Sequence, residues 1–87
     1  MDLFKIDPKR SFEHDLRKID RKFIPKILEA IESLSENPFP VQSRKMKGSE
    51  SSYRLRVGDY RVIYQIDTEK KIVTVYYARH RKDIYKR

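Results

Sequence analysis

The fold is decided by one stretch of the sequence, Tyr53-Arg54-Leu55-Arg56-Val57-Gly58-Asp59-Tyr60-Arg61-Val62-Ile63-Tyr64. On both sides of the Gly58-Asp59 pair, apolar or aromatic residues recur at every second position, which is typical of strands with one buried face. A glycine in the first central position suits a two-residue hairpin turn. The stretch therefore predicts two antiparallel strands, 53–57 and 60–66, joined by a tight turn.

The turn determines which side chains share a face of this hairpin. If Gly58 and Asp59 form the loop, Arg56 lies opposite Arg61, and Arg54 lies on the same face. Like charges placed directly opposite each other lower the stability of a sheet, whereas guanidinium groups bind phosphate through a bidentate fork. The hairpin therefore predicts either a phosphate-binding face or arginines that simply extend into water.

The rest of the chain predicts a single α+β domain over residues 1–87. In chain order we expect a strand, two helices and three strands, near residues 3–7, 12–23, 24–34, 53–57, 60–66 and 72–77. The polar residues 41–51 are expected to form a loop. The order β-α-α-β-β-β predicts a helix hairpin packed on one face of a twisted antiparallel sheet, with the opposite face left free.

The third strand of this meander is expected to extend the arginine-bearing face. With residues 68–69 at the centre of the second turn, Arg61 lies opposite Tyr76, so Tyr76 joins the arginines. The same register turns Tyr60, Tyr64 and Tyr77 toward the helices. Tyrosines in that position are expected to be core residues with their hydroxyls at the rim.

The composition points to an anionic partner. The 87 residues include 21 Lys and Arg against 13 Asp and Glu, a formal net charge of +8 at pH 7. A charge of this sign suits a polyanion such as nucleic acid, or an acidic protein. With no cysteine and 2 histidines, the sequence supports neither a metal site nor a cofactor. No apolar run approaches the length of about 18 residues that a membrane span needs, and the N-terminus lacks a secretory pattern, so we expect a cytoplasmic protein.

The hairpin resembles the signature hairpin of the RelE/ParE toxin superfamily. The upstream Lys47-Gly48 loop, the helix hairpin before it and the closing residues 80–85 agree with this resemblance. It implies a toxin of a type II toxin–antitoxin pair that an antitoxin neutralises. RelE-like members cut mRNA in the ribosomal A site without a metal, by attack of a 2′-hydroxyl on the adjacent phosphate. ParE-like members share the fold and inhibit DNA gyrase.

Carried over residue by residue, the resemblance implies roles for five side chains. Arg54 and Arg56 fall where RelE-type toxins often have basic residues, and Arg61 falls on a phosphate-binding arginine. Arg81 matches a C-terminal catalytic arginine, and Tyr85 matches a tyrosine assigned to proton transfer or base stacking. Fixed cations of this kind stabilise the charge that develops on a phosphorus under attack.

The group that transfers the proton stays open. Where the best-known ribosomal nucleases of the superfamily carry lysines, this chain has arginines, which do not readily give up a proton. His80, with an unperturbed pKa of about 6.5, and Tyr85 are the candidates, and catalysis by charge and in-line orientation alone is the alternative. Lys45, Lys47 and Tyr76 are candidate RNA contacts, although ordinary loop charges and sheet packing explain them equally well.

Three functions compete on this sequence. The leading interpretation is a metal-independent endoribonuclease toxin whose partners are mRNA, the ribosome and an acidic antitoxin. The alternatives are a ParE-type gyrase inhibitor without nuclease activity and an inactive remnant that still binds an antitoxin. Convergence of arginines favours the first function, and the absence of strand lysines favours the other two.

Overall fold

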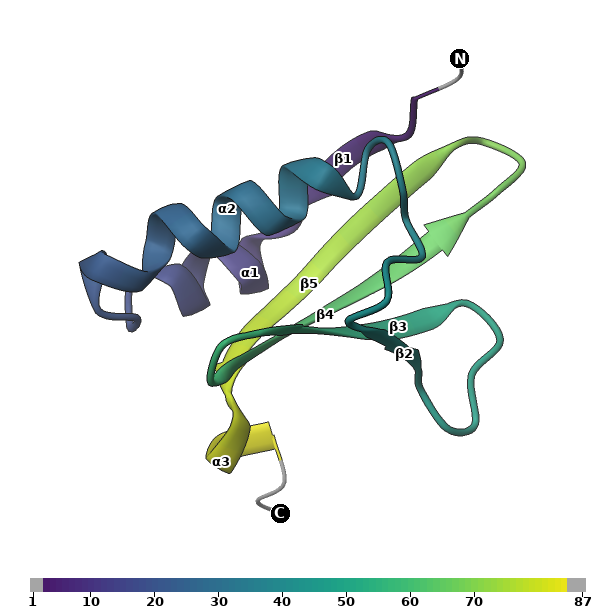
Figure 1. Cartoon of the computed structure of the whole chain (residues 1–87). Coiled ribbons are helices and arrows are strands. Elements are labelled where there is room, and N and C mark those ends of the chain that lie inside the picture. Colours follow the sequence, from purple (N-terminus) through teal and green to yellow (C-terminus); the bar gives the residue numbers. More distant parts are fainter. Residues whose placement is uncertain (1–2, 85–87) are drawn as a thin grey trace.

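The computed structural model describes residues 3–84, and Figure 1 shows their arrangement. In chain order the elements are β1 (Lys5–Pro8), α1 (Arg10–Leu16), the 3-10 helix η1 (Arg21–Phe23), α2 (Ile24–Ser33), β2 (Ser43–Lys45), β3 (Ser52–Val57), β4 (Tyr60–Asp67), β5 (Ile72–His80) and α3 (Arg81–Ile84). The five strands form one sheet in the order β1-β5-β4-β3-β2. The α+β architecture expected from the sequence is confirmed.

The helix hairpin covers one face of this sheet (Figure 1). In α2, Pro25 lies in the first turn, where its missing N–H costs no hydrogen bond. Ile27 and Ile31, one helical turn apart, are 1% and 4% exposed against the strands. The buried core comprises Phe12, Ile19, Ile27, Ile31, Leu34, Leu55, Val57, Val62, Tyr64, Ile66, Val73, Val75 and Ala78.

The sheet is mixed, whereas the sequence predicted an antiparallel one. The β3–β4 and β4–β5 pairs are antiparallel, but β1 pairs parallel with β5, and Lys5 lies beside Ile72. A long connection through the two helices separates β1 from the meander, and such a connection permits parallel pairing. This difference leaves the layer order unchanged.

The segment 41–51 is not entirely a loop, contrary to the sequence-based expectation. Ser43–Lys45 forms the edge strand β2 and pairs antiparallel with β3, and Arg44 lies beside Arg54. Three polar residues carry no periodic signal of their own. They form a strand because the edge of β3 offers backbone groups with which they can pair.

The predicted pairing of β4 with β5 is wrong. Arg61 lies opposite Arg79 rather than Tyr76. Two features shift the register: the connection spans residues 68–71 and contains Lys71 at φ 58°, and β5 has an irregularity opposite the step from Ile63 to Tyr64. An extra residue in one strand moves the following side chains to the other face.

This shift changes the position of one tyrosine in particular. Tyr77 is paired with Ile63 and is 37% exposed, so it lies on the uncovered face and not in the core. The expected core position of Tyr64 is confirmed, since Tyr64 is 0% exposed. None of the helices described for residues 3–84 is long and apolar enough to cross a membrane.

Candidate functional site

The hairpin register predicted from the sequence is confirmed, and with it the shared face of three arginines. Arg56 is the direct partner of Arg61, and Arg54 is the partner of Ile63. Leu55 and Val57 are buried beneath the helices, so the arginines between and beside them belong to the uncovered face. We call this uncovered side of β2, β3, β4 and β5 the open face.

A hollow of about 340 Å³ lies on the open face. We call it the arginine hollow; its lining is Val41, Gln42, Arg44, Arg54, Arg56 and Arg61. No carboxylate belongs to this lining. Arg44, on the unexpected strand β2, is the contributor that the sequence did not predict. No pattern in the sequence predicts this position, because Arg44 reaches the hollow only through the pairing of β2 with β3.

The four guanidinium groups differ in how they are held. Arg61 donates through Nη1 to the carbonyl oxygens of Gly58 (3.1 Å) and Tyr60 (3.0 Å), so it is tied to the hairpin turn. Within residues 3–84, Arg44 and Arg56 have no ion-pair partner and are exposed. Their charges are therefore available to an anion in the hollow.

The wall formed by Val41 and Gln42 is anchored from the core. The Tyr64 hydroxyl donates to the Pro38 carbonyl oxygen at 3.0 Å, and the amide of Arg56 donates to the Gln42 carbonyl oxygen at 3.1 Å. Burial raises the pKa of the Tyr64 hydroxyl, an effect that a hydrogen bond with Ser43 partly opposes. Tyr64 therefore connects the packed core to the rim of the hollow.

The open face continues onto β5 with an arginine that the sequence analysis missed. Arg79 lies directly opposite Arg61. Its Nε is 3.5 Å from Asp15 Oδ2, and its Cζ lies 4.3 Å from the centre of the Tyr77 ring. The Tyr76 ring is 6.4 Å from the Tyr77 ring, centre to centre, and the Tyr76 hydroxyl donates to Gln65 Oε1 at 3.1 Å. Aromatic rings and a further cation thus adjoin the arginine hollow.

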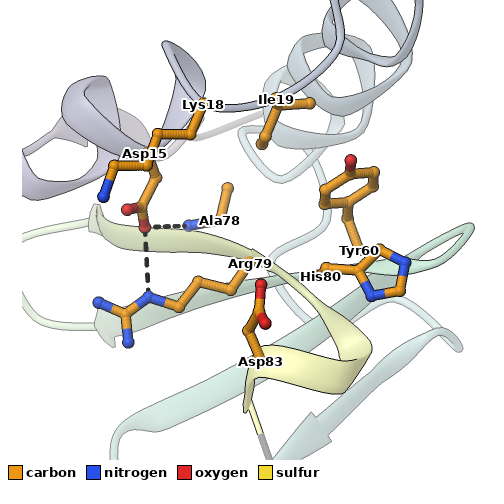
Figure 2. A pocket seen from close by; sticks show the side chains of 8 residues that line it. All are labelled: Asp15, Lys18, Ile19, Tyr60, Ala78, Arg79, His80 and Asp83. Carbon is orange, nitrogen blue, oxygen red and sulfur yellow. Dashed lines mark hydrogen bonds and ion pairs between the residues drawn. The ribbon is translucent and has the colours of Figure 1, made fainter.

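The structure does not bring His80 to this hollow. His80 is the strand partner of Tyr60, and their rings meet edge to face at 5.5 Å on the helix-covered side. It lines a second cavity of about 320 Å³, beside α1 and β5, whose lining also includes Asp15, Arg79 and Asp83 (Figure 2). His80 Nδ1 accepts a hydrogen bond from the amide of Lys82 at 3.2 Å.

Of the predicted residues that the structure describes, four others also lie outside the lining of the hollow: Arg81, Lys45, Lys47 and Tyr76. Arg81 lies at the hairpin turn, where its amide donates to the Asp59 carbonyl oxygen at 2.7 Å and its Nε is 3.8 Å from Asp59 Oδ1. Lys45 pairs with Tyr53, so it points to the face opposite Arg44. Lys47 is exposed in the turn after β2. Tyr85 lies outside the described residues.

The chemistry available in the hollow follows from its lining. Guanidinium groups remain charged at any physiological pH, so they attract an anion and stabilise charge that develops on it. The lining contains no His, Cys, Lys, Asp or Glu that could exchange a proton near neutral pH. Among residues 3–84, no group of three or more His, Cys, Asp or Glu could hold a metal ion.

Comparisons with known proteins agree with the resemblance in the sequence. The family model described as the ParE toxin of the type II toxin–antitoxin system parDE matches residues 6–85. A putative toxin RelE1 of Methanocaldococcus jannaschii is 29% identical over an alignment of 86 positions that covers 95% of this chain and 96% of that protein. Toxin RelG of Mycobacterium tuberculosis is 32% identical over 84% of this chain and 85% of its own length. The fold is similar to a chain in the RelE–RelB complex of Pyrococcus horikoshii OT3, with a TM-score of 0.80, 24% identity, and coverage of 93% of this chain and 97% of that one.

Proposed function

The chain belongs to the ParE toxin family of type II toxin–antitoxin systems, and from that premise we propose that it is a metal-independent endoribonuclease that cleaves mRNA. One observation carries the proposal. Four arginines surround a hollow without carboxylates, on the side of the sheet that the helices leave uncovered. Like charges at directly paired strand positions destabilise a sheet, and a bound anion relieves that repulsion. An RNA phosphodiester has the charge and oxygen geometry that guanidinium groups bind.

The proposed reaction uses the RNA's own nucleophile. The 2′-oxygen of the ribose attacks the adjacent phosphorus, its proton passes to water, and the bond from phosphorus to the 5′-oxygen breaks. The leaving 5′-oxygen takes a proton from water, so the products are a 2′,3′-cyclic phosphate and a 5′-hydroxyl. Arg56 and Arg61 bind the phosphate oxygens and stabilise the extra negative charge of the five-coordinate phosphorus.

Other side chains of the open face are proposed to bind the flanking RNA. Arg44 and Arg54 attract the neighbouring phosphates, because they lie beside each other at the edge of the sheet. Tyr76 and Tyr77 offer aromatic surfaces on which an unstacked base can stack. Sequence reasoning had placed only Tyr76 in this group.

Catalysis in this proposal depends on charge and orientation more than on a protein acid or base. His80 lies on the covered side of β5, so it is poorly placed to serve the phosphate. Tyr85 remains a predicted proton carrier. Fixed cations and in-line orientation are both large contributions to rate in phosphate chemistry.

A second candidate is supported by the same lining. Because the hollow contains no group that titrates near neutral pH, the open face could bind nucleic acid or a protein target without cleaving RNA. A gyrase inhibitor of the ParE type would need only such a binding surface.

We also propose an antitoxin and the ribosome as partners. The similar RelE of Pyrococcus horikoshii was solved with RelB bound. A formal net charge of +8 makes an acidic antitoxin the complementary partner for this chain. Ribosomal RNA supplies the polyanion that would bring the open face to mRNA.

One experiment separates these functions. The chain is expressed under an inducible promoter, mRNA 5′ ends are mapped by primer extension, and plasmid supercoiling is measured in the same cells. New 5′ ends that disappear in the Arg56→Ala/Arg61→Ala double variant support the nuclease, provided that Lys70→Ala, a matched loss of an exposed cation in the β4–β5 turn, retains them. Altered supercoiling with intact mRNA supports the gyrase inhibitor, and no effect in either assay overturns both.

A further inference from the structure

The helix α1 closes an edge of β5 that β1 leaves open. Beyond Val75, where the pairing with β1 ends, the Ser11 hydroxyl donates to the Tyr76 carbonyl oxygen at 2.6 Å. One helical turn later, Asp15 Oδ2 accepts from the Ala78 amide at 3.1 Å. Among the residues that the structure describes, Asp15 is the buried charged residue, at 8% exposure. Asp15 is therefore not an ordinary solvent-exposed charge, and its burial needs a structural explanation.

The bond to Ala78 does not explain why this residue is charged. The neutral side-chain oxygen of an asparagine can accept a hydrogen bond from a backbone amide equally well. A buried carboxylate instead loses its hydration and requires a cation to compensate. The only ion-pair partner of Asp15 in residues 3–84 is Arg79, whose Nε lies 3.5 Å from the same Oδ2. Within the part of the chain that the structure describes, Arg79 is thus the ion-pair partner that compensates the Asp15 carboxylate.

The geometry of this ion pair leaves most of the guanidinium available. Figure 2 shows Arg79 meeting Asp15 through Nε, while the two terminal nitrogens point away from the carboxylate. The Tyr77 ring, 4.3 Å from Cζ, supports one flat side of the group. Arg79 is therefore fixed at one edge and one face, and its side chain remains 48% exposed.

The restrained Arg79 is paired across the strands with an arginine that lines the arginine hollow. Arg79 and Arg61 are direct partners on neighbouring strands, which in a sheet lie about 5 Å apart. Arg61 is itself tied to the Gly58 carbonyl oxygen. Two arginines on adjacent strands are thus each restrained by an acceptor of their own.

We propose that Asp15 is a positioning residue: it holds Arg79 by Nε so that the two terminal nitrogens bind an RNA phosphate on the open face, beside the phosphate bound at Arg61. This inference rests on the proposed RNA binding and deepens it. Asp15 does not touch RNA itself. An arginine held in place loses less side-chain entropy on binding, so its contribution to affinity is larger than that of a free one.

The first test is a double-mutant cycle. Binding of a short single-stranded RNA is measured by fluorescence anisotropy, with a 2′-deoxy substitution at the cleavage position to prevent turnover. We expect Asp15→Asn to weaken binding about tenfold in the unmodified protein and to have no effect in an Arg79→Ala background. Asp59→Asn, which removes the exposed carboxylate next to Arg81, is the matched control and should leave affinity unchanged.

The second test needs no variant. In ¹⁵N-labelled protein, the Arg79 Nε–H should exchange slowly with solvent because it is held by Asp15. RNA should shift the resonances of the terminal nitrogens while Nε–H stays protected. Loss of that protection on RNA binding would mean that Arg79 leaves Asp15, and it would overturn the proposal even if Asp15→Asn does not fold.

The outcomes distinguish this inference from the proposed function. If the unmodified chain binds RNA, and Asp15→Asn weakens binding equally with and without Arg79, then Asp15 supports only the strand edge and the inference is overturned. If the unmodified chain neither binds nor cleaves RNA, the proposed function is overturned and this inference with it. Tenfold coupling with Nε–H protected in the complex supports this inference, whereas the proposed nuclease activity is supported separately by cleavage of unmodified RNA.

Discussion

Arg56 and Arg61 are direct partners across β3 and β4, on the face of the sheet opposite α1 and α2. Directly opposed like charges lower the stability of a sheet. Arg61 offsets part of this cost by donating to carbonyl oxygens of the hairpin turn, whereas Arg56 has no ion-pair partner among residues 3–84. The pair is therefore asymmetric, and the two positions respond differently to substitution.

Arg56→Ala is expected to leave the free energy of unfolding unchanged or to raise it by about 0.5 kcal/mol, because it removes the repulsion and no ion pair. Arg61→Ala should be less stable than Arg56→Ala by about 1 kcal/mol, because it also removes the bonds to Gly58 and Tyr60. Urea denaturation followed by circular dichroism measures both values. A loss of stability in Arg56→Ala equal to that in Arg61→Ala would contradict the asymmetry.

The salt dependence of RNA binding should report how many phosphates the open face contacts. For single strands, each contact contributes a slope of about −0.7 to the plot of log affinity against log salt concentration. Arg44→Ala should therefore make the slope less negative by about 0.7, because Arg44 lines the hollow. Lys70→Ala, in the exposed turn between β4 and β5, should leave the slope unchanged. Equal slopes for both variants would show that Arg44 does not contact an RNA phosphate.

His80→Gln is expected to retain RNA cleavage within about threefold, since the ring packs on Tyr60 on the covered side of the sheet. The pH profile of cleavage should also have the same shape in His80→Gln as in the unmodified chain. Single-turnover cleavage measured between acid and neutral pH tests both statements. A bell-shaped profile whose acid limb disappears in His80→Gln would make His80 a proton carrier after all.

Tyr64→Phe is expected to lower the free energy of unfolding by about 1 kcal/mol at neutral pH, because it removes the hydrogen bond to Pro38. The raised pKa of Tyr64 also predicts a pH effect. A folded-state pKa above the unfolded one stabilises the protein below the unfolded pKa of about 10, and this contribution is lost as pH rises beyond it. Urea unfolding at mildly alkaline and more alkaline pH should therefore show a smaller decline for Tyr64→Phe than for the unmodified chain. An equal decline of the unfolding free energy with pH in both proteins would show that ionisation of Tyr64 does not cause it.

The parts that sequence reasoning predicted correctly depend on local signals. Gly58 and Asp59 fix a two-residue turn, and this turn alone determines that Arg56 faces Arg61. The same alternation places Leu55 in the core. A short turn leaves one register available, so the open face follows from residues close together in the chain.

The parts that were missed depend on contacts distant in the chain. The β4–β5 register depends on the positive φ of Lys71 and on an irregularity within β5. Neither feature can be recognised from the alternation of polar and apolar residues in the sequence. That register decides that Arg79, and not Tyr76, faces Arg61. Arg44 joins the hollow only because β2 pairs with the edge of β3.

The central claim is that RNA phosphate binds on the open face, at the arginine hollow. It is tested most directly by NMR titration of the labelled chain with the cleavage-resistant RNA, following arginine side-chain resonances. We predict that the signals of Arg44, Arg56 and Arg61 shift together and saturate at one RNA concentration. Shifts confined to the helices, with these three arginines unchanged, would contradict the claim.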